Sequence, residues 1–155
     1  MTPNVMAFGV FFCAEWECLM HVIRLRRPWQ RCCDGTADER VDVPDDEPFT
    51  TESGSVGTSV RYRRSFNCPS GLQSHTVVVL RVRRWTGKMT SLVFNGTPVT
   101  TSGCPLEVDL SRWIEPHNTI ELTLESENGE SPRLTGEVSL NIAEHDGTTQ
   151  ISSTV

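Results

Sequence analysis

The sequence has little lysine and an excess of acidic residues. Lys88 is the one lysine among 14 basic residues, and the 20 Asp and Glu residues give a net charge of −6. A general nucleic-acid binder carries a basic surface, because the phosphate backbone is negatively charged. The charge balance therefore argues against nucleic acid as a partner.

The motifs of several enzyme classes are also missing. The chain contains no GxSxG elbow of a serine hydrolase and no GxGxxG or GxxxxGK[ST] phosphate loop. Glycoside hydrolysis needs two carboxyl groups that face each other across a cleft, ~5–9 Å apart. Glu121 and Glu125 share one predicted strand, which places them ~13 Å apart at ~3.3 Å per residue and facing water. We therefore expect no enzymatic activity from this chain alone.

Cysteine and histidine form no zinc-type cluster. No CxxC pair occurs, and the four histidines are scattered along the chain. Free thiols are the main expectation, although a disulfide between Cys68 and Cys104 stays open because both lie in loops at strand ends. The cysteines are Cys13, Cys18, Cys32, Cys33, Cys68 and Cys104.

One acidic cluster could hold a metal ion. Asp42, Asp45, Asp46 and Glu47 surround Pro44 in a segment that reads as a long surface loop. Carboxylate oxygens in a flexible loop suit Ca²⁺, although no EF-hand spacing is present. A structural calcium is one prediction here and a solvated acidic loop is the alternative. No other cofactor is expected.

The chain lacks a long hydrophobic run. Residues 5–14 are apolar, but a bilayer span needs ~20 such residues. A secretory signal is not supported either, because no basic segment precedes this run and Glu15 and Glu17 follow it. A membrane is therefore not an expected partner, and the cytoplasm is favoured as the compartment.

We expect a poorly ordered lead over 1–19, one domain over 20–144 and a flexible tail over 145–155. Whether the lead is native or comes from an upstream start codon stays open.

Short alternating apolar runs fill the predicted domain. In Val77–Trp85, the pattern places Val78, Leu80 and Val82 on one face, towards a core. Asn95-Gly96 follows another apolar run and predicts a reversal between strands, because both residues tolerate a positive φ. Turn signals recur at a spacing of roughly ten residues and no long helix is indicated, as in an all-β sandwich.

Five segments resemble the sugar-binding domain of family 2 glycoside hydrolases. They are RYRRSFNCP, VVVLRVRRW, SLVFNG, PLEVDLSRWIEPHNTIELTL and LTGEVSLNI. The matching positions of the family pattern are Phe66, Asn95, Gly96, Val108, Asp109, Leu110, Trp113, Asn118 and Ile120. The sequence departs from the pattern at His117, where the family has glycine, and it lacks the tryptophan that often flanks an early proline of the family.

The resemblance implies a galactose-binding-domain-like jelly roll without catalytic residues, because the family's catalytic carboxylates belong to another domain. It favours a non-catalytic carbohydrate-binding or accessory module. Arg81, Arg83 and Trp85 share one strand face, and with Asn95 they are the candidate sugar contacts. An indole can stack on a pyranose, whereas arginine and asparagine can hydrogen-bond its hydroxyls. Ordinary arginine–tryptophan packing is the alternative for these residues.

Two other functions stay open at this point. One is a structural or protein-interaction sandwich without sugar affinity, and the other is a fragment of a larger glycosidase. The expected partner is accordingly a carbohydrate or another protein domain.

Overall fold

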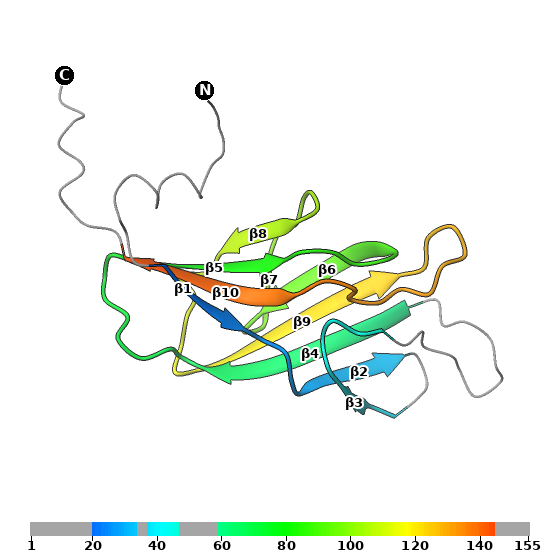
Figure 1. Cartoon of the computed structure of the whole chain (residues 1–155), viewed down its shortest axis with the longest axis horizontal. Helices are drawn as coiled ribbons and strands as arrows, with labels where there is room; N and C mark the ends of the chain where they lie inside the picture. The colour runs from blue at the N-terminus through cyan, green and yellow to red at the C-terminus, as the bar shows by residue number, and fades with distance from the viewer. Residues whose placement is uncertain (1–19, 34–36, 47–58, 145–155) are drawn as a thin grey trace, which may run out of the picture.

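The computed structural model describes residues 20–33, 37–46 and 59–144 (Figure 1). The predicted lead 1–19 and tail 145–155 lie outside these residues. The described part contains strands and turns and no helix, and the strands form two antiparallel sheets. The predicted all-β sandwich is confirmed.

Each sheet is built from strands that are distant in sequence. The four-stranded sheet has the order β1 (Met20–Arg24), β10 (Val138–Glu144), β5 (Thr76–Val82) and β8 (Leu106–Asp109). The six-stranded sheet has the order β3 (Glu39–Val41), β2 (Trp29–Cys33), β4 (Ser59–Asn67), β9 (His117–Glu125), β6 (Lys88–Phe94) and β7 (Thr97–Pro98). Figure 1 shows the two sheets as stacked layers.

The core lies between the inner faces of the two sheets. Val78, Leu80 and Val82 of β5 are buried, as the alternation predicted. From the other sheet, Leu122 and Leu124 of β9 are fully buried in the same cluster. Each side chain of this kind contributes ~1.5–3 kcal/mol when it leaves water. The inward residues therefore hold the layers together, and the outward residues remain available for binding.

Strand β2 was not predicted. The low content of apolar residues over Gln30–Gly57 indicated a long surface loop there, with at most a short strand at Arg40–Val43. Instead, Trp29 is fully buried and begins a strand that pairs with both β3 and β4. The apolar alternation fails here because Arg31, which is only 5% exposed, takes an inward position beside the buried Cys33. A charged residue at an inward position breaks the alternation of apolar and polar residues, so a prediction based on hydrophobicity misses the strand.

A buried polar cluster compensates the charge of Arg31. Arg31 Nη1 donates to Asp45 Oδ2 at 2.5 Å, and the Tyr62 hydroxyl donates to the same oxygen at 2.6 Å. Arg31 Nη2 also donates to Glu39 Oε2 at 2.8 Å. The backbone of Asp45 is held as well, because its N–H donates to Leu134 O at 2.7 Å. The cluster therefore ties β2, β4 and the segment around Leu134 to one buried carboxylate.

Tyr62 is expected to resist ionisation in the folded protein. Burial, and then the hydrogen bond to Asp45, raise the pKa of Tyr62 well above its ordinary value of 10.0. Below about pH 10 both the folded and the unfolded chain keep the phenol proton, whereas above it only the unfolded chain loses it. The free energy of unfolding should therefore fall as the pH rises through this region.

This chain has a single tyrosine, so tyrosinate absorbance reports Tyr62 alone. We expect the absorbance of the folded protein to stay flat past pH ~10 and to rise together with loss of the circular-dichroism signal. Tyr62→Phe is the control, since the stability of this variant should depend less on pH in the same range. Ionisation near pH ~10 with the fold intact would contradict the prediction.

Candidate functional site

The chain segment that leaves β5 carries three arginines. Arg81 is the last outward residue of the strand, and Arg83 and Arg84 follow its final residue, Val82. Two backbone hydrogen bonds hold this segment against the chain that enters β10. Arg83 N–H donates to Glu137 O at 3.0 Å, and Gly136 N–H donates to Arg84 O at 2.9 Å.

This close approach requires glycine at position 136. A Cβ on Gly136 would lie 2.7 Å from Arg84 N and 3.1 Å from Arg83 Cβ. Both neighbouring atoms are fixed by the backbone, so a larger residue would push the two segments apart. Gly136 therefore determines the distance between the arginine segment and the entry to β10.

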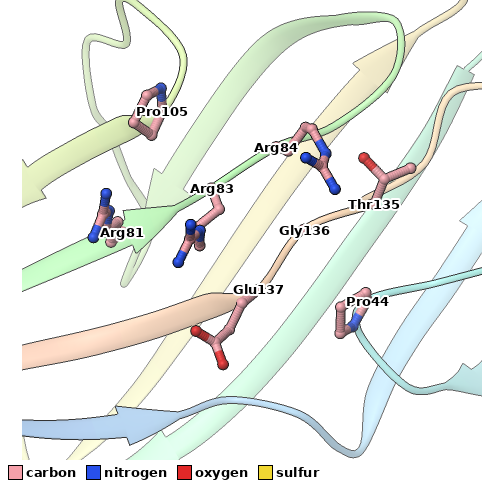
Figure 2. Close-up of a pocket in the computed structure, with 8 residues that line it drawn as sticks. All are labelled: Pro44, Arg81, Arg83, Arg84, Pro105, Thr135, Gly136 and Glu137. Atoms are coloured by element: carbon pink, nitrogen blue, oxygen red, sulfur yellow. The ribbon is translucent and has the colours of Figure 1, made fainter.

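A pocket of about 550 Å³ opens at this junction (Figure 2). Its lining residues come from four segments that are far apart in sequence. They are Pro44, Arg81, Arg83, Arg84, Pro105, Thr135, Gly136 and Glu137. Figure 2 shows the three arginines along one segment and Thr135 to Glu137 along its neighbour.

The carboxylates near the pocket already have partners. Glu137 Oε2 accepts a hydrogen bond from Arg24 Nε at 2.7 Å. Glu107 Oε2 lies 3.3 Å from Arg81 Nε, and these groups attract by charge although the geometry is not that of a hydrogen bond. Arg83 and Arg84 are exposed, and among residues 20–33, 37–46 and 59–144 neither has a carboxylate within ion-pair distance. The pocket therefore presents two guanidinium groups that are available to a ligand.

Two of the four candidate sugar contacts line this pocket, and two do not. Arg81 and Arg83 are both lining residues. Trp85 is half-buried and packs against the core, outside the lining. The predicted stacking of its indole on a sugar thus stays a prediction, and the packing alternative accounts for the contacts that the structure shows.

Asn95 occupies the predicted reversal and holds it together. Its φ of 51° is positive, as the Asn-Gly signal indicated. Its Nδ2 donates to Trp113 O and to Asn118 Oδ1, both at 3.0 Å, and its Oδ1 accepts from Thr119 N–H at 2.8 Å. Both ends of the amide are thus engaged within the protein, so Asn95 orders the corner before β7.

Sequence reasoning missed Arg84, Thr135, Gly136 and Glu137. Strict alternation places Arg84 on the inner face with Val82, but the strand ends before it and Arg84 is exposed. The remaining three residues reach the pocket through the pairing of β10 with β5, which has no signal in the local sequence. The run of arginines was the one available indication.

The three described carboxylates of the acidic loop do not gather around one point. Asp45 is buried with Arg31 and Tyr62, whereas Asp42 lies 3.3 Å from Arg27 at the surface. Asp46 is exposed, and Glu47 lies outside the described residues. Within the described ranges, no group of three or more His, Cys, Asp or Glu side chains could hold a metal ion. Calcium binding, which also involved Glu47, stays a prediction.

No disulfide joins the cysteines of the described residues. Cys32, Cys33, Cys68 and Cys104 form no disulfide with one another, so the Cys68–Cys104 bridge is not present in the structure. Cys13 and Cys18 lie outside the described residues. In the part of the chain that the structure covers, no helix has the length and apolar character needed to cross a membrane.

No protein-family model and no curated protein matches the sequence. Solved structures of glycosidases do match. The FMN-binding beta-glucuronidase from Facaelibacterium prausnitzii L2-6 aligns with a TM-score of 0.65 and 18% identity, over 81% of this chain and 23% of that one.

Two further glycosidases show the same relation. A beta-glucuronidase from Bifidobacterium dentium, complexed with coumarin-3-O-glucuronide, gives a TM-score of 0.66 and 15% identity over 82% of this chain and 30% of its own. A putative beta-galactosidase from Bacteroides fragilis gives a TM-score of 0.62 and 14% identity, over 81% of this chain and 23% of its own. The chain thus spans between 23% and 30% of the length of these three proteins. At these identities the likeness concerns the fold, and in its fold the chain resembles one β-sandwich portion of these glycosidases, as the resemblance in sequence predicted.

Proposed function

We propose that this domain is a non-catalytic carbohydrate-binding or accessory module and that its sugar site is the pocket beside β5. The observation that carries the proposal is the set of polar side chains around this one concave surface, above all the exposed Arg83 and Arg84. Ligand sites are concave surfaces in which a few well-placed polar groups set the orientation of the ligand. Guanidinium groups can donate to sugar hydroxyls from a fixed, planar arrangement.

The structural neighbours support the sugar class. Their names describe enzymes that act on glycosides, and this chain corresponds to less than a third of the length of each neighbour reported above. A domain that forms a minor part of such enzymes suits an accessory role. The same partial overlap supports a variant of the proposal, in which the chain is one domain of a larger glycosidase.

The pocket favours binding over hydrolysis. Glu137 is the single carboxylate among the lining residues of this pocket, and it is paired with Arg24. A glycosidase site needs a second carboxylate ~5–9 Å away, on the other side of the scissile bond. The lining residues do not supply this pair, so the proposed action is reversible binding.

Calorimetric titration with a panel of neutral and acidic mono- and disaccharides tests the proposal. We expect at least one sugar to bind the wild-type protein, and Arg83→Gln to weaken that binding by about 10-fold or more, because a hydrogen bond from a charged donor contributes ~1.5–3 kcal/mol. Arg112→Gln is the matched control, since Arg112 is exposed and lies outside the pocket lining. If the wild-type protein binds none of the sugars, the proposal is wrong.

A protein-interaction sandwich is the second candidate, and Trp113 is the observation that favours it. Trp113 is 37% exposed, and its carbonyl is fixed by the hydrogen bond from Asn95. Tryptophan is enriched among the residues that contribute most to binding at the centres of protein interfaces. On this alternative the protein binds no sugar, and Trp113→Ala lowers the amount of a partner that co-purifies from its own lysate.

A further inference from the structure

We infer that the ligand of the pocket is an acidic sugar, whose carboxylate or sulfate group binds Arg83 and Arg84. This inference rests on the proposed function and narrows it to one class of carbohydrate. Its first basis is the local charge. Arg24, Arg81, Arg83 and Arg84 lie in or beside the pocket, against the carboxylates of Glu107 and Glu137.

The excess of positive charge is local to this site. The whole chain has a net charge of −6, so a general basic character does not explain why four guanidinium groups gather here. Like charges that are held in one concave site repel each other, and an anion between them removes that repulsion. A neutral sugar would leave the repulsion in place.

In the described part of the chain, the ion pairs near the pocket involve Arg24 and Arg81, and not Arg83 or Arg84. Glu137 would compete with an anionic ligand if it faced Arg83, but its carboxylate is already bound to Arg24 at 2.7 Å. Arg81 has Glu107 beside its Nε at 3.3 Å. The exposed side chains of Arg83 and Arg84 have no such neighbour among the residues that the structure describes. The two carboxylates thus balance Arg24 and Arg81 and leave Arg83 and Arg84 for a ligand.

The backbone prepares these two arginines for binding. The hydrogen bonds of Arg83 N–H to Glu137 O and of Gly136 N–H to Arg84 O fix the positions of both Cα atoms. A guanidinium group on a fixed backbone can form two parallel hydrogen bonds to a carboxylate or sulfate, which a lysine ammonium group cannot. Thr135, which lies on the opposing segment in Figure 2, supplies a hydroxyl for the neutral part of a sugar.

A matched set of ligands tests the inference by isothermal calorimetry. The set is methyl β-glucoside, methyl β-glucuronide and glucose 6-sulfate, with sodium acetate and sodium sulfate as sugar-free anions. We expect the glucuronide or the sulfated sugar to bind about 10- to 100-fold more tightly than the neutral glucoside, because each charged hydrogen bond adds ~1.5–3 kcal/mol. We also expect this advantage to shrink as the salt concentration rises.

Substitutions of the two pocket arginines test whether the acidic group of the sugar binds there. Arg83→Gln/Arg84→Gln should bring binding of the acidic sugar down to the level of the neutral one, and Arg112→Gln should leave both unchanged. Both pocket arginines are exposed, so the melting temperature and circular dichroism of the double variant should match those of the wild type. Arg83→Lys/Arg84→Lys keeps both positive charges but loses the planar guanidinium groups. If this variant prefers the acidic sugar over the neutral one less strongly than the wild type does, the planar geometry of the guanidinium groups contributes to recognition.

The outcomes separate this inference from the proposed function. Equal affinity for the glucoside and the glucuronide would overturn the inference and leave sugar binding intact. Binding of acetate or sulfate as tightly as the acidic sugars would also overturn it, since the pocket would then be an anion site without sugar recognition. If no sugar binds, both the inference and the proposed function are wrong.

Discussion

Replacing Asp45 by alanine should lower the free energy of unfolding by about 3 kcal/mol, the lower end of the ~3–5 kcal/mol that is lost when one partner of a buried ion pair is removed. Asp45 is 4% exposed, and its carboxylate accepts hydrogen bonds from the buried Arg31 and Tyr62. Without it, the Tyr62 hydroxyl loses its acceptor and the Arg31 charge loses its innermost partner. Glu39 still contacts Arg31, which is why we expect the lower end of the range.

Urea unfolding monitored by circular dichroism measures this loss. Asp42→Ala is the matched control, because Asp42 forms its ion pair with Arg27 at the surface, where both side chains are more than half exposed. The control should change the free energy of unfolding by less than ~1 kcal/mol. Asp45→Asn should fall between the two, since the amide oxygen can still accept from Tyr62. A loss below ~1 kcal/mol for Asp45→Ala would show that the cluster does not stabilise the fold.

Replacing Gly87 by alanine should also destabilise the protein strongly, by roughly 2–6 kcal/mol. Gly87 has a φ of +86°, and an added Cβ would collide with the backbone oxygen of Glu125 and lie 3.0 Å from Pro132 Cβ. The positive φ costs ~1–3 kcal/mol for a residue with a side chain, and overpacking costs ~1–3 kcal/mol more. Neither contact can be relieved by rotating a flexible side chain.

Gly129→Ala separates these two contributions. Gly129 has a φ of +77°, but nothing lies within 4 Å of the position of its added Cβ. Only the cost of the positive φ remains there, so the loss in the same urea experiment should be about 1–3 kcal/mol. If the free energy of unfolding falls by the same amount in Gly87→Ala and Gly129→Ala, the close approach of Gly87 to Glu125 does not contribute to the destabilisation.

Gly87 also bears on the candidate site. The preceding residue, Thr86, donates its N–H to Arg133 O at 2.9 Å, which joins the turn to the chain that leads into β10. Displacing Gly87 from Glu125 should therefore shift the arginine segment against Thr135 and Glu137. We expect Gly87→Ala to weaken ligand binding at the pocket more than Gly129→Ala does.

Much of the fold could be predicted because it has a local cause. The alternation in β5 follows from one buried and one outward face, and Val78, Leu80 and Val82 are buried as expected. The reversal at Asn95 follows from its tolerance of a positive φ. Each of these features depends on neighbours within a few residues, so it is visible in the sequence.

The candidate site could be predicted only in part. The run of arginines drew attention to Arg81 and Arg83, which both line the pocket. Their surroundings depend on Gly136 and Glu137, which lie more than fifty positions away and meet the arginines through the pairing of β10 with β5. Similarly, Asp45 looked like a loop acid in the sequence but is the buried partner of Arg31 and Tyr62.

The sequence by itself determined the sandwich class, the inward faces of its central strands and the resemblance to a sugar-binding domain. All three are encoded in the period of two of a β-strand and in short turn signals. The tertiary structure alone decided which charges are compensated: it pairs Arg31 with Asp45 and Arg24 with Glu137, and leaves Arg83 and Arg84 exposed at a pocket. The physical reason is that charge compensation acts between side chains that meet in space, whatever their separation along the chain.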